Sequence, residues 1–142
     1  MSVSSEGALT GSPAISRLGG DPPSPWEELF GFSRIVQAGS LVVISGTTAI
    51  DPAGVVVGST PYEQAVEIFS KLRRELQRLG LELDSVIQTR MYVTDISRSG
   101  EVGRAHAQAF GAVRPAATMV EVSALIDPRM LVEVELLALR PS

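Results

Sequence analysis

The chain has 142 residues, which is close to the length of one domain, and it contains no cysteine. Disulfides, thiolate metal sites and a cysteine nucleophile are therefore excluded. The formal net charge of −4 at pH 7 argues against a nucleic-acid partner, because nucleic-acid-binding surfaces are normally basic. The sequence has no apolar run of about 18 residues, so we expect no membrane partner. Its first residues show no basic region followed by an apolar run, so we expect no signal peptide and a cytoplasmic location.

The first 25 residues are rich in Ser, Gly and Pro and show no hydrophobic periodicity. This composition predicts a flexible tail over residues 1–25, followed by one domain over residues 26–142. The segment Trp26–Phe30 has three large apolar side chains within five residues, so we expect it to dock on the domain.

Three strands are expected next, over residues 32–38, 41–45 and 55–57. Gly39 and Ser40 fit a tight turn between the first two. The run Asp51-Pro52-Ala53-Gly54 is a strong turn signal before the third.

Two helices are expected, with a strand over residues 86–94 between them. The first begins at Pro61 after Thr60, with Glu63 placed to complete a capping box, and ends near Gly80. Its predicted buried stripe is Ala65, Ile68, Leu72, Leu76 and Leu79. The second helix runs from about Ser99 to Gly111, with a stripe of Val102, Ala105, Ala109 and Phe110. In the intervening strand, Ile87, Met91 and Val93 are expected on one face and Gln88, Arg90 and Tyr92 on the other.

The chain is expected to close with two strands, over about 114–122 and 131–138. Side chains in a strand alternate between two faces, so four apolar residues share one face of the last strand: Val132, Val134, Leu136 and Ala138. The other face carries Leu131, Glu133, Glu135 and Leu137. A carboxylate on that face must be solvated, paired with a cation or part of a functional site, because an unpaired buried charge is costly.

This element order predicts an α+β fold with two helices on one face of a mixed sheet. The other face should carry polar and apolar side chains together: Arg34, Gln88, Arg90, Glu121, Glu133 and Glu135 with Tyr92, Met119 and Leu137. Large apolar groups are costly to leave bare, so we expect this face to meet a partner.

Six short motifs occur in order between about residues 30 and 140: Phe32-Ser33-Arg34, Val43-Ile44-Ser45-Gly46, Glu63-Gln64-Ala65, Val93-Thr94-Asp95, Pro115-Ala116 and Val132-Glu133-Val134-Glu135. Together they resemble the RidA family, also called YjgF or endoribonuclease L-PSP. The resemblance implies a chorismate-mutase-like fold, a homotrimer and substrate pockets between neighbouring subunits.

In the deaminase branch of that family, an imine or enamine derived from an amino acid is hydrolysed to a keto acid and ammonia. The resemblance implies a water-orienting Glu, and Glu133 matches it. The branch's carboxylate-binding Arg, which directly follows the Pro-Ala pair, is here Ala117. Its pocket Tyr and Asn correspond to Phe32 and Gly103. The chain therefore resembles a diverged member that lacks the deaminase Arg.

Several other residues are candidates for the same substrate site: Ser45, Gly46, Thr47, His106, Arg114, Thr118 and Met119. Ser45-Gly46 is also typical of a close approach of backbone at a strand end. His106 is the only His; its position between Val102 and Phe110 favours a packed, half-buried ring over a pocket acid or base. Glu133 has two interpretations that can both hold, pairing with Arg34 or Arg90 and orienting water.

We expect neither a metal nor a cofactor: one His and no Cys leave few soft ligands, and there is no glycine-rich nucleotide motif. The sequence favours a RidA-like hydrolase or lyase that acts on an enamine, imine or related metabolite in an intersubunit cleft. It is not expected to be a standard 2-imino acid deaminase. The alternative is a non-catalytic trimeric metabolite-binding module. The acidic balance disfavours a ribonuclease.

Overall fold

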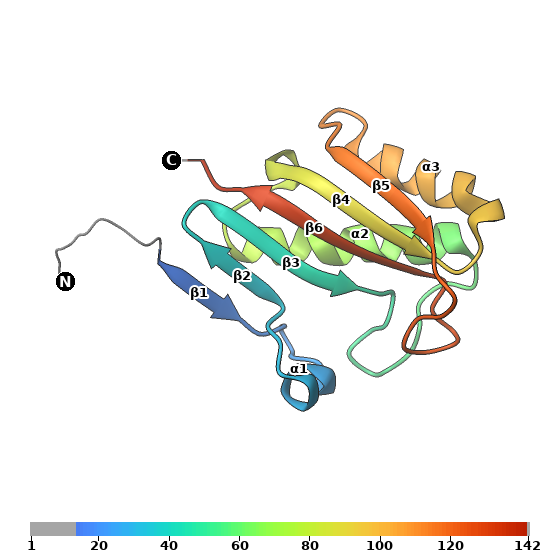
Figure 1. Cartoon of the computed structure of the whole chain (residues 1–142), viewed down its shortest axis with the longest axis horizontal. Coiled ribbons are helices and arrows are strands. Elements are labelled where there is room, and N and C mark those ends of the chain that lie inside the picture. Colours follow the sequence, from blue (N-terminus) through green and yellow to red (C-terminus); the bar gives the residue numbers. More distant parts are fainter. Residues whose placement is uncertain (1–13, 142) are drawn as a thin grey trace, which may run out of the picture.

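The computed structural model describes residues 14–141 and shows helices on one face of a mixed six-stranded sheet (Figure 1). The strands are β1 (Ile15–Leu18), β2 (Ile35–Ala38), β3 (Leu41–Thr47), β4 (Val86–Val93), β5 (Ala116–Glu121) and β6 (Val132–Leu139). The helices are α1 (Pro25–Phe30), α2 (Pro61–Arg78) and α3 (Ser99–Phe110), with short 3₁₀ turns η1 (Leu83–Ser85) and η2 (Ile96–Arg98). The sheet order is β1-β2-β3-β6-β4-β5, and only β4 and β5 run parallel.

The core lies between the sheet and helices α2 and α3, as the sequence predicts. Both helices lie behind the sheet in Figure 1, and the face toward the viewer carries no helix. In α2 the predicted stripe is buried as far as Leu76, and Leu79 packs at its margin. In β6 the predicted apolar face is buried, since Val132, Val134, Leu136 and Ala138 are each at most 2% exposed.

The ends of α2 follow local sequence chemistry. Thr60 caps the helix, because its Oγ1 accepts a hydrogen bond from the Glu63 backbone N–H at 3.1 Å. The predicted capping box is wrong: the Glu63 carboxylate accepts from the backbone N–H of Ser59, one residue earlier than the box requires. Gly80 ends the helix with φ of 73°, a left-handed conformation that glycine adopts at little cost.

The folded part of the chain starts earlier than the sequence predicts. β1 lies inside the range predicted as a flexible tail and pairs antiparallel with β2, Leu18 opposite Ile35. The segment after it is held by Glu27, whose carboxylate accepts from the backbone N–H groups of Gly20 and Ser24 at 3.0 and 2.8 Å. Residues 1–13, the first thirteen of the predicted tail, lie outside the described residues. The short β1 has no alternating pattern that separates it from a polar linker, since only Leu18 is partly covered.

The strand predicted at residues 55–57 is also wrong. This segment belongs to a loop that makes one isolated bridge, Ile50 with Val56. The loop is fastened to α2 by Lys71, whose ammonium donates to the carbonyl oxygens of Thr48 and Ile50 at 2.6 and 2.7 Å. Lys71 therefore serves as a link between the helix and this loop.

Two strands differ in detail from their predicted faces. A register shift between Val86 and Gln88 turns Ile87 outward, where it is 45% exposed, and Thr89 takes the buried position. In β5, Met119 and Glu121 pair in register with Met91 and Val93, so both belong to the helix side and not to the open face. Because β5 lies at the sheet edge, period-two alternation alone could not decide which of its faces the helices cover.

Candidate functional site

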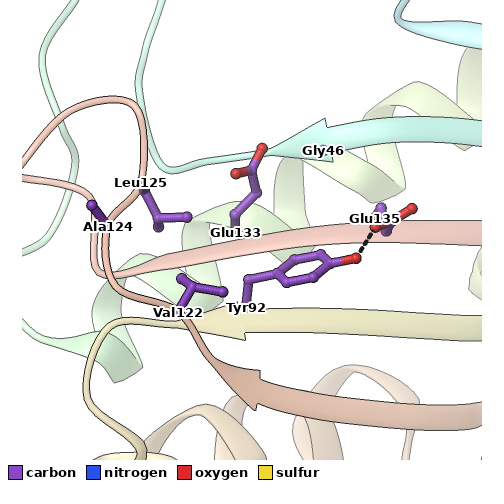
Figure 2. Close-up of a pocket in the computed structure, with 7 residues that line it drawn as sticks. All are labelled: Gly46, Tyr92, Val122, Ala124, Leu125, Glu133 and Glu135. Atoms are coloured by element: carbon purple, nitrogen blue, oxygen red, sulfur yellow. Dashed lines mark hydrogen bonds between the residues drawn. The ribbon is translucent and has the colours of Figure 1, made fainter.

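A pocket of about 350 Å³ lies on the open face of the sheet, where β3 ends beside β6 (Figure 2). Its lining comes from three strands and from the loop after β5: Gly46, Tyr92, Val122, Ala124, Leu125, Glu133 and Glu135. Figure 2 shows the Glu133 carboxylate reaching toward Gly46, with Leu125 on one side and Tyr92 on the other. The pocket therefore combines two carboxylates and a phenol with an apolar rim.

Gly46 makes room for the Glu133 carboxylate. The β3–β6 register shifts between Ile44 and Thr47, so Ser45 and Gly46 lie in an irregular step of the strand. A Cβ on Gly46 would overlap Glu133 Oε2 and lie 3.0 Å from its carboxyl carbon. The prediction that Ser45-Gly46 serves a close approach at a strand end is thus confirmed.

Arg34 fixes the backbone of this step. Its guanidinium donates to the carbonyl oxygen of Gly46 at 2.9 and 3.0 Å and to Thr47 Oγ1 at 2.9 Å. The hydroxyl of Ser45 donates to the carbonyl oxygen of Ser33 at 2.6 Å. The hydroxyls of Ser45 and Thr47, on either side of Gly46, are therefore both engaged by protein groups.

Glu133 is a half-buried carboxylate without an ion pair. Among the described residues, no cationic nitrogen lies within 4.0 Å of it, so the predicted pairing with Arg34 or Arg90 is absent within this chain. Burial raises the pKa of the Glu133 carboxyl, and the nearby Glu135 charge adds to the rise, whereas Arg34 opposes it. A raised pKa suits a group that accepts and returns protons near neutral pH.

Tyr92 and Glu135 form a hydrogen-bonded pair at the floor of the pocket. The Tyr92 hydroxyl donates to Glu135 Oε1, the contact drawn as a dashed line in Figure 2. This hydrogen bond raises the pKa of the Tyr92 hydroxyl, so the phenol stays protonated as a donor. Arg90 lies opposite Glu135 in the register and lines a small second depression, outside the main pocket.

The pocket brings together only two of the predicted site residues, Gly46 and Glu133. Phe32 lies outside its lining, 38% exposed, with the Arg34 guanidinium 6.0 Å from its ring centroid. It follows α1, which extends beyond the end of the β1–β2 hairpin in Figure 1 and exposes Leu29 and Phe30 by 75% and 64%.

Ser45 and Thr47 flank Gly46, and the other predicted residues lie on α3, on β5 and in the turn between them. Ala117 pairs in register with Thr89, and Thr89 Oγ1 lies 2.8 Å from His106 Nε2 on α3. His106 also packs against Phe69 and Phe110. It is the half-buried ring that the sequence favours, and burial lowers its pKa. This group lies on the helix side of the sheet, so within one chain the sheet separates it from Glu133.

Gly103, Thr118, Met119 and Arg114 lie around this second group. Gly103 is on α3, and a methyl group added at its Cα would meet no atom within 4 Å. Thr118 points to the open face beside Arg90, whereas Met119 packs against the core margin. Arg114 is exposed in the turn before β5 with φ of 58°, a left-handed conformation that is uncommon for a residue other than glycine.

Sequence reasoning missed five lining residues: Tyr92, Glu135, Val122, Ala124 and Leu125. Two of them had a signal, because the alternation of side chains already predicts Glu135 and Tyr92 on the same open face as Glu133. The loop residues had none, since a loop's path depends on the elements that it crosses.

Other kinds of site lack support in the described part of the chain. No three His, Asp or Glu side chains among residues 14–141 cluster as a metal site requires. None of the helices there is long and apolar enough to span a membrane. Three of the basic side chains on α2 are engaged, with Arg73 on Glu82, Arg78 on Glu75, and Arg74 on Ser70.

Comparisons with known proteins agree with this architecture. The model of a family described as Endoribonuclease L-PSP matches residues 26–140. An uncharacterised protein of Streptomyces coelicolor is 42% identical over 82% of this chain and 87% of its own length. A mouse protein named 2-iminobutanoate/2-iminopropanoate deaminase is 29% identical over 77% of this chain and 81% of its own length.

A crystal structure shows the same fold. It is that of Rv2704 from Mycobacterium tuberculosis, described as a member of the YjgF/YER057c/UK114 family. It superimposes with a TM-score of 0.79 at 41% identity, covering 89% of this chain and 99% of that one. The α+β architecture with its mixed sheet is therefore shown, and the chain belongs to the RidA family, also known as the YjgF or endoribonuclease L-PSP family.

Proposed function

We propose that this chain is a RidA-type hydrolase that acts on a small imine or enamine, with water activated by Glu133. The observation that carries the proposal is the half-buried, unpaired Glu133 carboxylate, held against Gly46 in the open-face pocket. At least one relative, the mouse protein, is named as an imine deaminase, and this supports the reaction class.

The chemistry needs one proton acceptor and one water. Glu133 takes a proton from water as the oxygen attacks the C=N carbon and passes it to the nitrogen, which gives a tetrahedral amino alcohol. It then takes the hydroxyl proton of this intermediate as the carbonyl forms and gives it to the departing nitrogen as the C–N bond breaks, so that imine and water become carbonyl compound and ammonia. A carboxyl group whose pKa is raised by burial is suited to both transfers.

The substrate is proposed to lack the carboxylate that a 2-imino acid carries. Ala117 offers a methyl group where the deaminase branch has its Arg. The polar pair nearest to it by register is Thr89 with His106, and burial lowers the His106 pKa. A neutral imidazole does not replace a guanidinium, which holds a carboxylate by two parallel charged hydrogen bonds.

We further propose that three copies of the chain associate through the open sheet face. That face exposes apolar side chains, with Ile15, Val120 and Leu139 exposed by 54%, 43% and 47%. Association would cover them and would bring the β5 edge of one copy toward the pocket of another. Sedimentation equilibrium of the full chain tests this: a monomer at micromolar concentration contradicts it.

A non-catalytic binding module is the second candidate. It is favoured by the loss of polar groups at Phe32, Gly103 and Ala117, which leaves Glu133 alone of the family's four. Binding of a metabolite without any turnover would support it.

The deciding experiment measures imine hydrolysis. Imines of differing charge are generated in situ by an amine or amino-acid oxidase, and ammonia release is compared with the buffer rate. We expect acceleration by wild type, loss of it in Glu133→Gln, and retention in Asp84→Asn, a matched change of an exposed acid in η1. Equal rates for wild type and Glu133→Gln across the panel contradict the hydrolase.

A further inference from the structure

We propose that the open-face pocket selects a small organic cation, an iminium or ammonium group that carries a short apolar substituent. This inference rests on the proposed function for the identity of the site, and it names the charge class of the substrate.

The charges that line the pocket are of one sign. Glu133 and Glu135 stand two residues apart on the same face of β6, and both line the pocket. Burial is the main cause that raises the pKa of Glu133, and the charge of Arg34 opposes it. The negative charge of Glu135 raises the Glu133 pKa further. A cation between the two carboxylates would relieve that repulsion, whereas an anion would increase it.

The two arginines near the pocket, Arg34 and Arg90, do not line it. Arg34 directs its guanidinium to the Gly46 carbonyl oxygen and Thr47 Oγ1. Arg90 lines the neighbouring depression and not this pocket. None of the described lining residues carries a positive charge.

The rest of the lining fits an organic group better than a metal ion. Val122, Ala124 and Leu125 form the rim, and Figure 2 shows Val122 and Leu125 on the same side of Glu133. Hard metal ions require roughly six to eight oxygen ligands. An alkyl group packs on this rim while its ammonium or iminium head meets the carboxylates. The Tyr92 hydroxyl is already donated to Glu135, so it orients one carboxylate oxygen and leaves the other for the ligand.

Three probes with the same isopropyl group and different charges test this: isobutylammonium, isobutanol and isobutyrate. Binding to the full chain is followed by NMR chemical-shift changes at pH 7 and constant ionic strength. We expect isobutylammonium to bind at least about tenfold more tightly than the other two, and raised salt to weaken it. Equal or tighter binding of the alcohol or the carboxylate, or no binding of any probe, overturns the proposal.

Variants of the lining residues test whether isobutylammonium binds in this pocket. Glu135→Gln should weaken isobutylammonium by about tenfold, whereas Tyr92→Phe, which keeps the charge, and Asp84→Asn should change it by less than about threefold. An unchanged affinity in Glu135→Gln with an intact thermal transition contradicts the assignment. If Glu135→Gln does not fold, the salt dependence of isobutylammonium binding to wild type decides instead. An affinity that does not fall as the salt concentration rises contradicts recognition by charge.

The two proposals fail separately. Tight isobutylammonium binding with no imine hydrolysis supports the cation site and removes the hydrolase. Glu133-dependent hydrolysis that favours anionic imines over cationic ones supports the hydrolase and removes the cation site.

Discussion

Buried and partly exposed residues alternate along β6. Val132, Val134 and Leu136 on the helix side are almost fully buried. Glu133, Glu135 and Leu137 on the open side keep part of their surface in water. The two faces share one backbone and differ only in what covers them. Helices α2 and α3 close one face with apolar side chains and leave no space for an unpaired charge. The open face holds two carboxylates beside aliphatic groups, a combination that a closed core would not tolerate.

The comparison separates stability from chemistry. Groups on the helix side hold the domain together, and their removal should cost free energy of unfolding whatever the ligand. Groups on the open side contribute less to folding and are the ones available to a substrate or to another copy of the chain.

The largest expected effect is on the free energy of unfolding, when two neighbouring leucines on opposite faces of β6 are each replaced by alanine. Leu136→Ala should lower the free energy of unfolding by about 2–5 kcal/mol, because it leaves a cavity under α2. Leu137→Ala should cost much less in a dilute sample and should instead weaken self-association. Denaturant unfolding at several protein concentrations distinguishes them, and equal, concentration-independent losses would contradict the division between the faces.

Gly46→Ala should disturb the chemistry more than the fold. The added methyl group displaces the Glu133 carboxylate, and a displacement near 1 Å at a reacting group can cost about a hundredfold in rate. We expect a loss of about tenfold to a hundredfold in imine hydrolysis with a small change in melting temperature. Gly100→Ala on α3, where a methyl group meets no atom within 4 Å, is the control.

The pH dependence of stability should have opposite signs on the two faces. Burial raises the Glu133 pKa above 4.5, so the folded state binds the proton more tightly and stability is lost as pH rises through the folded pKa. Glu133→Gln should therefore gain on wild type as pH rises above 4.5, by at most about 1 kcal/mol after solvent screening.

His106 behaves in the opposite way. Burial lowers its pKa below 6.5, so the unfolded chain takes up the proton first and stability is lost as pH falls below 6.5. His106→Gln should flatten that part of the profile. Urea unfolding from pH 4 to 8 measures both effects, and parallel curves for all three proteins would show that neither group is linked to folding.

The smallest expected effect is at Gly103. Alanine there meets no atom within 4 Å and favours the helix, so Gly103→Ala should stabilise the domain by about 0.5–1 kcal/mol. Unchanged activity would place this position outside the working cleft. A large loss of activity in a stable variant would place it in a cleft made with another copy.

Several features could be read from the sequence because they are local. The period-two pattern of β6 and the stripe of α2 identified their buried faces, and Thr60 and Gly80 marked the ends of α2. The shared pattern of short motifs gave the family and therefore the fold. The Ser45-Gly46 pair and Glu133 were candidates before their contact was known.

Other features depended on how distant segments meet. Only the register with β4 placed Met119 and Glu121 on the helix side, and only a shift in that strand turned Ile87 outward. β1 became a strand because β2 offered it an edge, although its own residues carry no clear pattern.

What the sequence determined by itself was the identity of helices α2 and α3, most strands and one catalytic candidate, since propensity and periodicity act between residues a few positions apart. What the tertiary structure decided was which groups surround Glu133 in the pocket: a glycine from β3, a tyrosine from β4, a second carboxylate and the loop after β5. These groups are far apart along the chain, and only the order and register of the strands bring their side chains to one pocket.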